Sequence, residues 1–544
     1  NNNAALTQTS THLITMAVAA LLNLSTPLLP QAALQRSTVT PSSESISRLV
    51  ARLRSGLPIV ATAIGQSNTA DAAGCFGAVA CGERAMKGVQ SDVRPGYSWA
   101  GDFFRWLNRT WPHPQHALYN RAVGASNARF VTTCLASHLS PRTHLLLVDF
   151  NIGGWRLALQ EHFARTAASL PRRPFVLFVG FVDWCPRYVV PQADIQARLM
   201  SGRKPGDWVN ARIQIEKVHC QRSLDKADVA TDDSIGDVTA RVAAHYGFGF
   251  VSLFRALRPL LVGEWNGGTS HLKQLRKVTF DGIHGAYGYA PGYGKVEGEF
   301  SAYYRSVTEL LIHFVSAAFS SSSSSSQRQP STGLGAAAPP ADDAAESALP
   351  TPLDGRVQPP SGMLSCYAWD TKIVGALPAP RVVHNSSRVP PGWNINEFST
   401  NGTKRRKPGL VSLVPGDTVE LVLHAGGAAH QSACLGLSYL ESYELMGTVV
   451  AECRPPCACA PKRIDALNAA ARHSLFRTVE LAATLTTAPE CVVRLSNEGA
   501  SAAGALSKFR VSGMYVRRRN TDGGCERAPP TLRLSELDRN TAYR

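Results

Sequence analysis

The sequence has few acidic residues for its length. It carries 40 Asp and Glu against 56 Lys and Arg, which gives a formal net charge of +16 at pH 7. Such a charge favours acidic partners, which include nucleic acid, anionic polysaccharide and anionic lipid headgroups. No nucleic-acid-binding motif accompanies the two basic clusters, Lys404–Lys407 and Arg517–Arg519, so we expect no nucleic-acid partner. We interpret both clusters as solvated surface, with binding to an acidic polymer as the alternative.

The apolar run near the start of the chain is too short to cross a membrane. Leu13–Leu22 is nearly continuous in apolar residues, but a spanning helix needs ~20 of them, so we expect no spanning helix. Its length suits the core of a secretory signal peptide, although the chain begins with Asn1 and no Lys or Arg precedes the run. We predict that residues 1–45 are a signal-like segment and a disordered lead, and that the protein is secreted or lumenal. Asn-x-Ser/Thr sequons fit this route at Asn23, Asn108, Asn385 and Asn401.

The cysteines lack the paired Cys-x-x-Cys spacing of zinc ribbons. There are 12 cysteines in the chain, and Cys453, Cys457 and Cys459 crowd one Pro-rich turn. We predict disulfides, at least two of them between Cys366 and Cys525, with a zinc site as the alternative. Disulfides persist in oxidising compartments, which agrees with secretion. We expect no metal and no organic cofactor.

The chain length of 544 residues exceeds one usual domain, so two domains and a linker are expected. Over residues 46–319, short apolar strand-like runs alternate with helical patterns. This alternation predicts a three-layer α/β/α sandwich with a mostly parallel sheet. The strand-like runs are Ile59–Ile64, Leu145–Phe150, Phe175–Phe181 and Gly249–Leu253, and the helical patterns are Phe103–Leu107, Trp155–Ser169, Val238–Tyr246 and Tyr303–Phe319.

Seven consecutive serines begin a Ser/Pro/Ala-rich segment, residues 320–361, whose composition predicts a linker. Beyond it, over residues 362–520, short strand-like runs separated by turns predict a cysteine-bearing, all-β sandwich domain. Residues 521–544 are polar and are predicted to be a tail. The predicted strands of this domain are Leu410–Val414, Val419–Leu423, Leu435–Tyr439, Gly447–Ala451, Phe476–Leu481, Cys491–Ser496 and Phe509–Val516.

A serine follows the first predicted strand. Ser67 lies in Gly65-Gln66-Ser67-Asn68-Thr69, at the carboxyl end of a buried strand, where open α/β sheets build their sites. Gly65 would let the backbone turn sharply, and the Ser67 amide would point toward an oxyanion formed at its own hydroxyl. The pattern is not the Gly-x-Ser-x-Gly elbow of α/β-hydrolases. The alternative role for Ser67 is that of a helix N-cap.

A second motif follows the last predicted strand of the same domain. Asp281 stands three residues before His284, so the carboxylate can curl back to hold and orient the imidazole. The alternative is a surface turn with a capping Asp. Because the serine follows the first strand and this dyad follows the last, we predict a Ser67–His284–Asp281 triad.

This layout resembles the SGNH, or GDSL, hydrolase family over about residues 58–318. Gly65-Gln66-Ser67 is similar to the family's first block, with Gln66 in place of the common Asp. The segment Asn120–Ser126 is similar to its second block, and Gly124 then corresponds to the oxyanion glycine. Asp281 and His284 match the Asp-x-x-His block without change.

The third block departs from the family pattern. Gly153 stands where the family has an oxyanion-donating Asn, and Asn151 lies two residues earlier. Alternate residues of an extended strand point the same way, so Asn151 can still supply the amide. The resemblance thus implies an oxyanion hole from Ser67, Gly124 and Asn151.

The resemblance implies a flavodoxin-like SGNH fold and hydrolysis of a carboxylic ester through an acyl-enzyme, without a cofactor. The Cys-bearing β-domain, and the Phe103–Asn108 pattern before the second block, are similar to plant and algal members with an appended β-domain. The implied substrate is an O-acetyl ester, with a polysaccharide as the preferred carrier. Two alternatives stay open: transfer of the acyl group to a sugar hydroxyl by the same triad, and a degenerate protein that only binds glycans.

Overall fold

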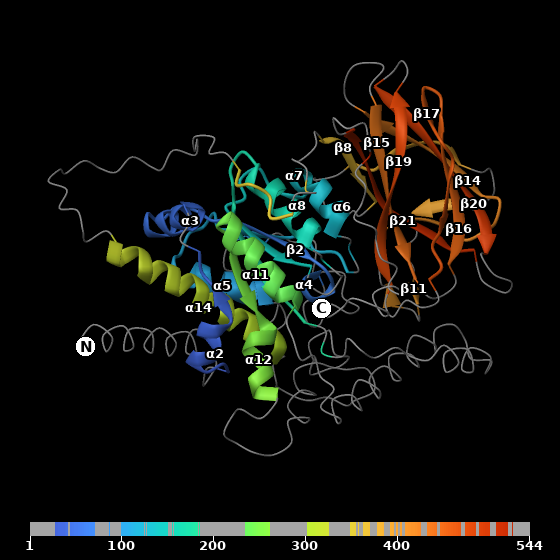
Figure 1. Ribbon diagram of the computed structural model, residues 1–544. Helices are drawn as coiled ribbons and strands as arrows, with labels where there is room; N and C mark the ends of the chain where they lie inside the picture. Colours follow the sequence, from blue (N-terminus) through green and yellow to red (C-terminus); the bar gives the residue numbers. More distant parts are fainter. Residues whose placement is uncertain are drawn as a thin grey trace, which may run out of the picture. The chain divides into compact units, whose positions relative to one another are not determined.

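The computed structural model describes the following residues: 28–41, 44–70, 86–87, 99–124, 126, 128–150, 155, 157–182, 184, 234–261, 302–325, 349–354, 357, 363–369, 378–385, 392–395, 399–400, 403–404, 409–425, 432–442, 446–468, 474–485, 489–500, 507–519 and 525. They belong to two compact units. The first takes the described residues up to Gly124, those from 140 to 184 and those from 234 to 354, and the second takes the rest (Figure 1). Among the helices described, none is long and apolar enough to span a membrane.

Within its described residues, the first unit is built on one sheet of seven strands, in the order β1-β7-β6-β5-β2-β4-β3. The five central strands pair in parallel, whereas β1 and β3 pair antiparallel at the edges. The strands are β1 Thr38–Val39, β2 Val60–Gly65, β3 Met86–Lys87, β4 Ala117–Asn120, β5 Leu145–Asp149, β6 Phe175–Gly180 and β7 Gly249–Ser252.

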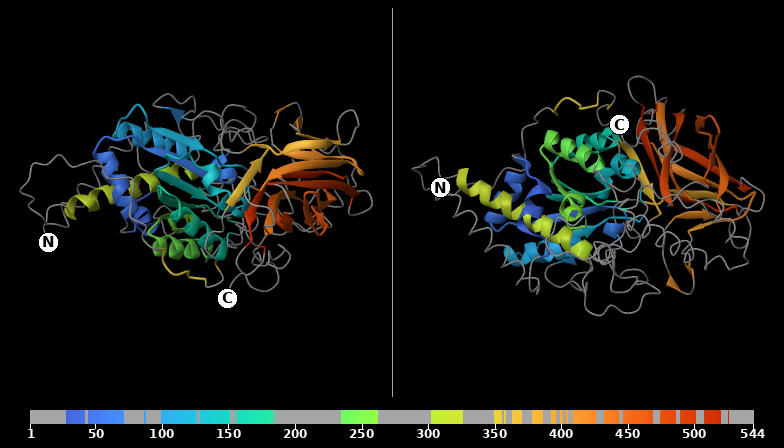
Figure 2. Two further views of the ribbon diagram at one scale, coloured as in Figure 1. Left: turned by 90° about the horizontal axis from the view of Figure 1, so that it is seen from above. Right: turned by 60° about the horizontal axis from the view of Figure 1, so that its bottom comes forward.

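Apolar residues on both faces of these strands require helices on both sides. Ala63, Leu147 and Leu177 face a core formed with α2 Gln31–Arg36, α3 Glu44–Arg54, α5 Trp99–Thr110, α12 Leu253–Leu261 and α14 Ala302–Ser325. On the opposite face, Phe178 packs against Phe163 of α8 Leu157–Ala168, which lies beside α11 Ser234–Tyr246. Figure 2 shows the helical layers on the two sides of the sheet. The predicted three-layer α/β/α sandwich is confirmed.

The strand order also locates the edge at which a site is expected. Numbered along the chain, the five parallel strands β2, β4, β5, β6 and β7 lie in the order 2-1-3-4-5, which is the flavodoxin-like order. After β2 the chain adds β3 and β4 on one side of β2, and it then crosses over to add β5 on the other side. Open α/β sheets build their sites at such a reversal, so a site is expected at the carboxyl ends of β2 and β5, next to Gly65 and Asp149.

Two predicted boundaries differ from the structure. The disordered lead is wrong for residues 31–39, which form α2 and β1; Leu34 is buried there and β1 pairs with β7. These elements are too short to show a period in the sequence. In addition, α14 continues to Ser325, within the predicted linker, where the Ser320 and Ser321 hydroxyls donate to carbonyls four residues earlier. Residues 1–27 lie outside the described residues, as does residue 326 of the serine run.

The end of the predicted linker is bound to the first unit. Glu161 of α8 is fully buried, and its carboxylate accepts hydrogen bonds from the amides of Leu353 and Asp354. The Tyr246 hydroxyl donates to the same carboxylate at 2.8 Å, and burial raises the pKa of Tyr246 to about 12. A buried carboxylate needs hydrogen-bond donors, and residues 349–354 supply two of them. These bonds anchor the segment to α8.

The second unit contains two antiparallel sheets that face one another. One has the order β10-β13-β21-β15-β19-β17, with β8 paired to β21, and the other has the order β18-β16-β20-β14-β9. A separate ribbon joins β11 to β12. The strands are β8 Met363–Ala368, β9 Arg381–Asn385, β10 Trp393–Ile395, β11 Ser399–Thr400, β12 Thr403–Lys404, β13 Leu410–Ser412, β14 Thr418–His424, β15 Ser432–Glu441, β16 Gly447–Arg454, β17 Cys457–Cys459, β18 Lys462–Asp465, β19 Leu475–Leu485, β20 Glu490–Ala500 and β21 Phe509–Arg518.

One hydrophobic core joins the inner faces of both sheets. Leu421 of β14 and Val493 of β20 share it with Leu437 of β15 and Val511 of β21. The predicted all-β sandwich is thus confirmed. The outer face of the second sheet carries opposite charges on neighbouring strands, as where Arg494 pairs with Glu420.

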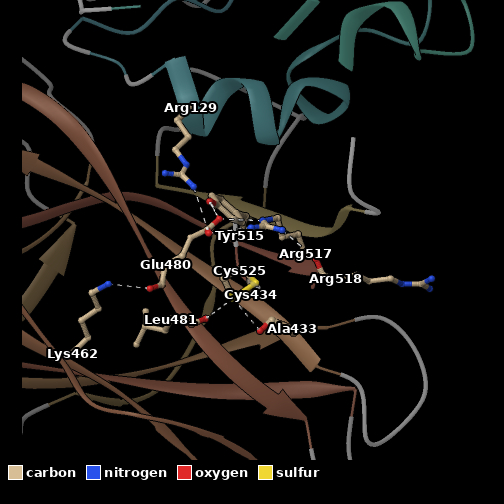
Figure 3. The surroundings of a disulfide bond; sticks show 10 residues. All are labelled: Arg129, Ala433, Cys434, Lys462, Glu480, Leu481, Tyr515, Arg517, Arg518 and Cys525. Atoms are coloured by element: carbon tan, nitrogen blue, oxygen red, sulfur yellow. Dashed lines mark hydrogen bonds and ion pairs between the residues drawn. A yellow bond between two sulfur atoms is a disulfide. The ribbon is translucent and has the colours of Figure 1, made fainter. Parts of the chain in front are cut away.

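Disulfides stabilise this unit, as predicted. Three join cysteines of the sandwich: Cys434–Cys525, Cys453–Cys459 and Cys457–Cys491. Figure 3 shows the first of them beside β15. The sulfur atoms of Cys453, Cys457 and Cys491 lie within 4.8 Å of one another, yet each is already bonded to another cysteine. The crowded cysteine turn therefore forms disulfides in this structure.

A short helical segment from the middle of the chain belongs to the second unit. The helices α6 Ala128–Thr133 and α7 Leu135–His138 follow β4 of the first unit, but Cys134 forms a disulfide with Cys366 of β8. Phe130 packs against Tyr515 of β21, and a side chain at Gly513 would collide with the Phe130 ring. The sandwich thus includes residues that precede it by more than 200 positions.

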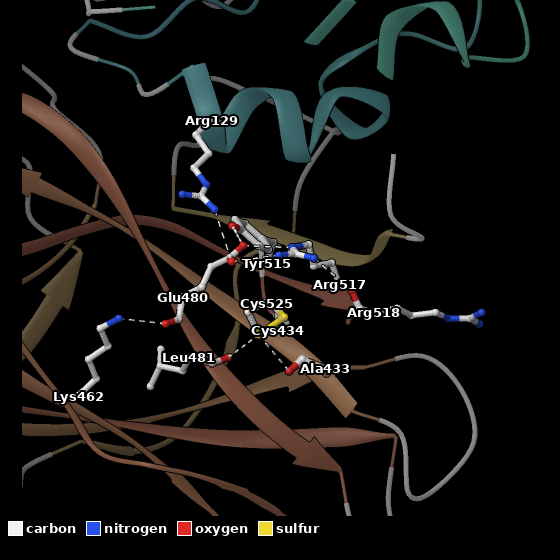
Figure 4. Close-up of polar contacts among 10 residues, drawn as sticks. All are labelled: Arg129, Ala433, Cys434, Lys462, Glu480, Leu481, Tyr515, Arg517, Arg518 and Cys525. Carbon is white, nitrogen blue, oxygen red and sulfur yellow. Dashed lines mark hydrogen bonds and ion pairs between the residues drawn. A yellow bond between two sulfur atoms is a disulfide. The ribbon is translucent and has the colours of Figure 1, made fainter. Parts of the chain in front are cut away.

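Below α6 lies a buried group of charged residues (Figure 4). Arg517 is only 2% exposed and donates two hydrogen bonds to Glu480, at 3.0 and 3.1 Å, and Arg129 of α6 lies 3.5 Å from the same carboxylate. Burial alone would raise the pKa of Glu480, but these arginines outweigh it and hold that pKa below its ordinary value. The predicted solvated surface is therefore wrong at Arg517, because Glu480 supplies a buried partner.

Candidate functional site

Ser67 is the accessible member of a tight turn at the carboxyl end of β2. It begins the short helix α4 Ser67–Ala70, and the amides of Thr69 and Ala70 donate to the Gln66 carbonyl at 3.1 and 2.8 Å. Gln66, Asn68 and Thr69 are buried, whereas Ser67 is partly exposed. The turn therefore leaves the serine partly accessible at the strand end and buries the residues on either side of it.

Gly65 is required by close packing. A Cβ atom at this position would lie 2.6 Å from the Asp149 carbonyl oxygen and 3.0 Å from the Thr69 hydroxyl. The next residue, Gln66, donates its amide to that same carbonyl at 3.1 Å. The glycine thus lets the turn lie directly against the end of β5.

The side chain of Asp149 fixes the far side of the turn. The Thr69 hydroxyl donates to Asp149 Oδ2 at 2.8 Å, and both side chains are buried, each 1% exposed. Asp149 lies in register with Gly65 on the neighbouring strand. One residue of β5 therefore contacts the chain on both sides of Ser67.

The loop after β4 is bonded to the same turn. Asn120 donates from Nδ2 to the Thr69 carbonyl at 2.7 Å and accepts from the Ala122 amide at 3.1 Å. The Val123 amide then donates to the Gly65 carbonyl at 3.1 Å. These bonds bring the residue before Gly124 against the last carbonyl of β2.

Two aromatic residues hold Asn68 from the helical layer. The Trp99 indole donates to the Asn68 carbonyl at 3.1 Å, and the Tyr304 hydroxyl donates to Asn68 Oδ1 at 3.0 Å. All three side chains are buried. Trp99 belongs to α5 and Tyr304 to α14, and these two helices pack against each other. The turn is therefore held by helices as well as by strands.

The structure describes two of the predicted site residues. Ser67 and Gly124 come from adjacent strand ends, β2 and β4, and the bonds above connect their loops. Asp281, His284 and Asn151 lie outside the described residues, as does Gly153. The triad and the third oxyanion donor therefore stay predictions.

Sequence reasoning gave no role to Thr69, Asn120 or Asp149. The sequence does mark two of them. Asp149 is the last residue of an otherwise apolar strand, and Asn120 is the last residue of the short strand β4, so each polar residue indicates a strand end. Tyr304 carried no such signal, because it falls within an apolar helix pattern.

Comparison with known proteins gave structural matches alone. No protein-family model matches the chain, and no curated protein does. The chain is similar to a two-domain esterase (CEX) active on acetylated mannans, with 12% identity and a TM-score of 0.48 over 90% of this chain and 99% of that chain. The co-crystal structure of this esterase with mannopentaose gives the same identity and score over 98% of that chain. A carbohydrate-binding module from Cellvibrio mixtus lichenase 5A in complex with cellotriose has 8% identity and a TM-score of 0.19, over 29% of this chain and 99% of that chain.

Proposed function

We propose that the first unit is a serine esterase. Ser67 attacks the ester carbonyl, His284 takes its proton and later protonates the leaving alcohol, and Asp281 orients the imidazole. The amides of Ser67 and Gly124, together with Asn151, stabilise the tetrahedral oxyanion. Water then hydrolyses the acyl-enzyme. This chemistry uses only side chains and amides of the chain itself.

One observation carries the proposal: the serine stands at the topological switch point in a turn that leaves it partly exposed between the buried residues Gln66 and Asn68. A serine that served only as an N-cap would not need a glycine before it at which a Cβ would lie 2.6 Å from the Asp149 carbonyl oxygen. Nor would its turn need hydrogen bonds from residues of β4, β5, α5 and α14. Such support from rigid elements is what a nucleophile needs, because catalytic groups must be held in a reactive geometry.

We propose O-acetyl groups on a polysaccharide as the substrate. The net charge of +16 suits a polymer that carries acidic groups, and the appended β-sandwich offers a separate surface for a long chain. The disulfides favour an oxidising, extracellular or lumenal setting, where such polymers occur. Transfer of the acetyl group to a sugar hydroxyl would use the same serine, and analysis of products from an acetyl donor with an oligosaccharide separates transfer from hydrolysis.

Labelling with a fluorophosphonate tests the proposal, because only an activated serine reacts at a useful rate. We expect the full-length protein to be labelled at Ser67 and Ser67→Ala to be unlabelled and inactive toward p-nitrophenyl acetate. The matched control is Ser55→Ala, which changes an exposed serine at the end of α3. An unlabelled wild-type protein would favour the glycan-binding alternative, and labelling that survives Ser67→Ala would show that the nucleophile is another residue.

A further inference from the structure

We propose that Thr69 and Asp149 form a positioning pair that holds the Ser67 turn in its reactive geometry. The inference rests on the proposed function, since it names what positions the same nucleophile. Neither residue is assigned to the chemistry itself.

Asp149 contacts the turn at two points that flank the serine. Its backbone carbonyl accepts the amide of Gln66, the residue before Ser67, at 3.1 Å. Its side chain accepts the hydroxyl of Thr69, two residues after Ser67, at 2.8 Å. The turn therefore cannot shift along β5 or rotate away from it without breaking one of these bonds.

A buried carboxylate at position 149 lowers the stability of the fold, so packing alone does not explain the Thr69–Asp149 pair. A carboxylate that is 1% exposed carries a large desolvation penalty, which hydrogen bonds offset only in part. An apolar residue here would bury equally well beside Val148 and Ile64, which are already in the core. Placing a buried carboxylate at the switch point, beside the serine turn, trades stability for a fixed geometry.

The pair is also connected to the rest of the site. The carbonyl of Thr69 accepts the Asn120 side chain at 2.7 Å, and Asn120 in turn binds the amide of Ala122 in the loop that leads to Gly124. A displaced Thr69 would therefore disturb the nucleophile and the proposed oxyanion glycine together. A small displacement of this kind can lower a rate by ~10²-fold.

The experiment compares Thr69→Val, Thr69→Ser and Asp149→Asn in the full-length protein. Valine has the shape of threonine without the hydroxyl, serine keeps the hydroxyl, and asparagine keeps an acceptor oxygen without the charge. We expect Thr69→Val to lower kcat and the rate of fluorophosphonate labelling by ~10²-fold with KM nearly unchanged, and Thr69→Ser to restore most of both. We expect Asp149→Asn to retain more activity than Thr69→Val, since it can still accept the hydroxyl.

Three outcomes would overturn the proposed positioning role. The first is a wild-type kcat in Thr69→Val, and the second is a failure of Thr69→Ser to restore kcat. The third is a double variant in which the Thr69→Val and Asp149→Asn effects on kcat simply multiply, because the effects of two bonded residues should be non-additive. If the wild-type protein is not labelled at all, the proposed function fails. The interaction between Thr69 and Asp149 is then tested by the melting temperatures of the same single and double variants. Additive shifts in melting temperature would show that the two residues are not coupled.

Discussion

Replacing Gly65 by alanine places one methyl group where the structure has no room for it. The new Cβ would lie 2.6 Å from the Asp149 carbonyl oxygen, 2.9 Å from Asp149 Cβ and 3.0 Å from the Thr69 hydroxyl. Two of these atoms belong to β5, which is fixed to β2 by its pairing, so they cannot move independently. Overpacking of this kind typically costs about 1–3 kcal/mol, and here the strain falls on the Ser67 turn.

The expected result is a loss of reactivity larger than the loss of stability. We expect Gly65→Ala to lower the fluorophosphonate labelling rate by ~10²-fold, because the turn must move away from β5 to accept the methyl group. Thermal unfolding, followed by circular dichroism, should show a modest decrease in melting temperature while the protein remains folded at 25 °C.

The matched control is Gly56→Ala, in the turn between α3 and β2. Gly56 has φ +63° and open space around its Cβ position, so alanine strains the backbone there without touching the site. This strain costs about 1–2 kcal/mol, close to the Gly65 effect. Equal labelling losses in the two variants would refute the reasoning, since the loss would then follow stability and not geometry.

Two further predictions address other parts of the molecule. Asn151→Ala should lower kcat by ~10²-fold with little change in KM, because an oxyanion donor acts mainly in the transition state; steady-state kinetics would clear Asn151 if kcat barely changes. The folded-state pKa of Glu480 lies below its ordinary value of 4.5, so its ionised form stabilises the sandwich above that pH and the stabilisation is lost as pH falls through the lower, folded-state value. Melting temperatures from pH 6 to pH 2 should therefore fall less steeply in Glu480→Gln than in Glu498→Gln, which removes an exposed carboxylate; equal slopes would contradict the assignment.

The long elements of both units could be predicted from the sequence because each has a clear pattern. Short, mostly apolar runs such as Leu145–Phe150 predict buried strands, and alternation of apolar and polar residues predicts strands of the sandwich such as Thr418–His424. The strand β4 escaped notice, since Ala117–Asn120 is short and half polar. Its absence from the prediction left the flavodoxin-like order to rest on the resemblance, whereas the pairing of β2 with β4 and β5 shows it directly.

The site was predictable at Ser67, but not in what surrounds it. Gly65 and the end of the apolar run predict a turn, because this pattern lies within a few residues of Ser67. The partners of the turn come from residues 31 to 236 positions away, such as Trp99, Asn120 and Tyr304, and no local pattern connects them. The burial of Arg517 was missed for the same reason, because its partner Glu480 lies 37 residues away on β19.

The disulfide between Cys134 and Cys366 closes the segment between these two residues into a covalent ring. The ring runs from α6 through β5, β6, β7 and α14, passes the serine run and returns at β8, while β2 and Ser67 lie outside it on the leading branch. A protease that cuts once between residues 326 and 348 would open the ring without releasing the sandwich, so the cleaved protein should migrate as one species until it is reduced. Conversely, a fragment beginning at residue 362 would carry Cys366 without its partner and Tyr515 without the Phe130 ring that packs on it. The natural unit for expression of the sandwich is therefore two pieces of chain.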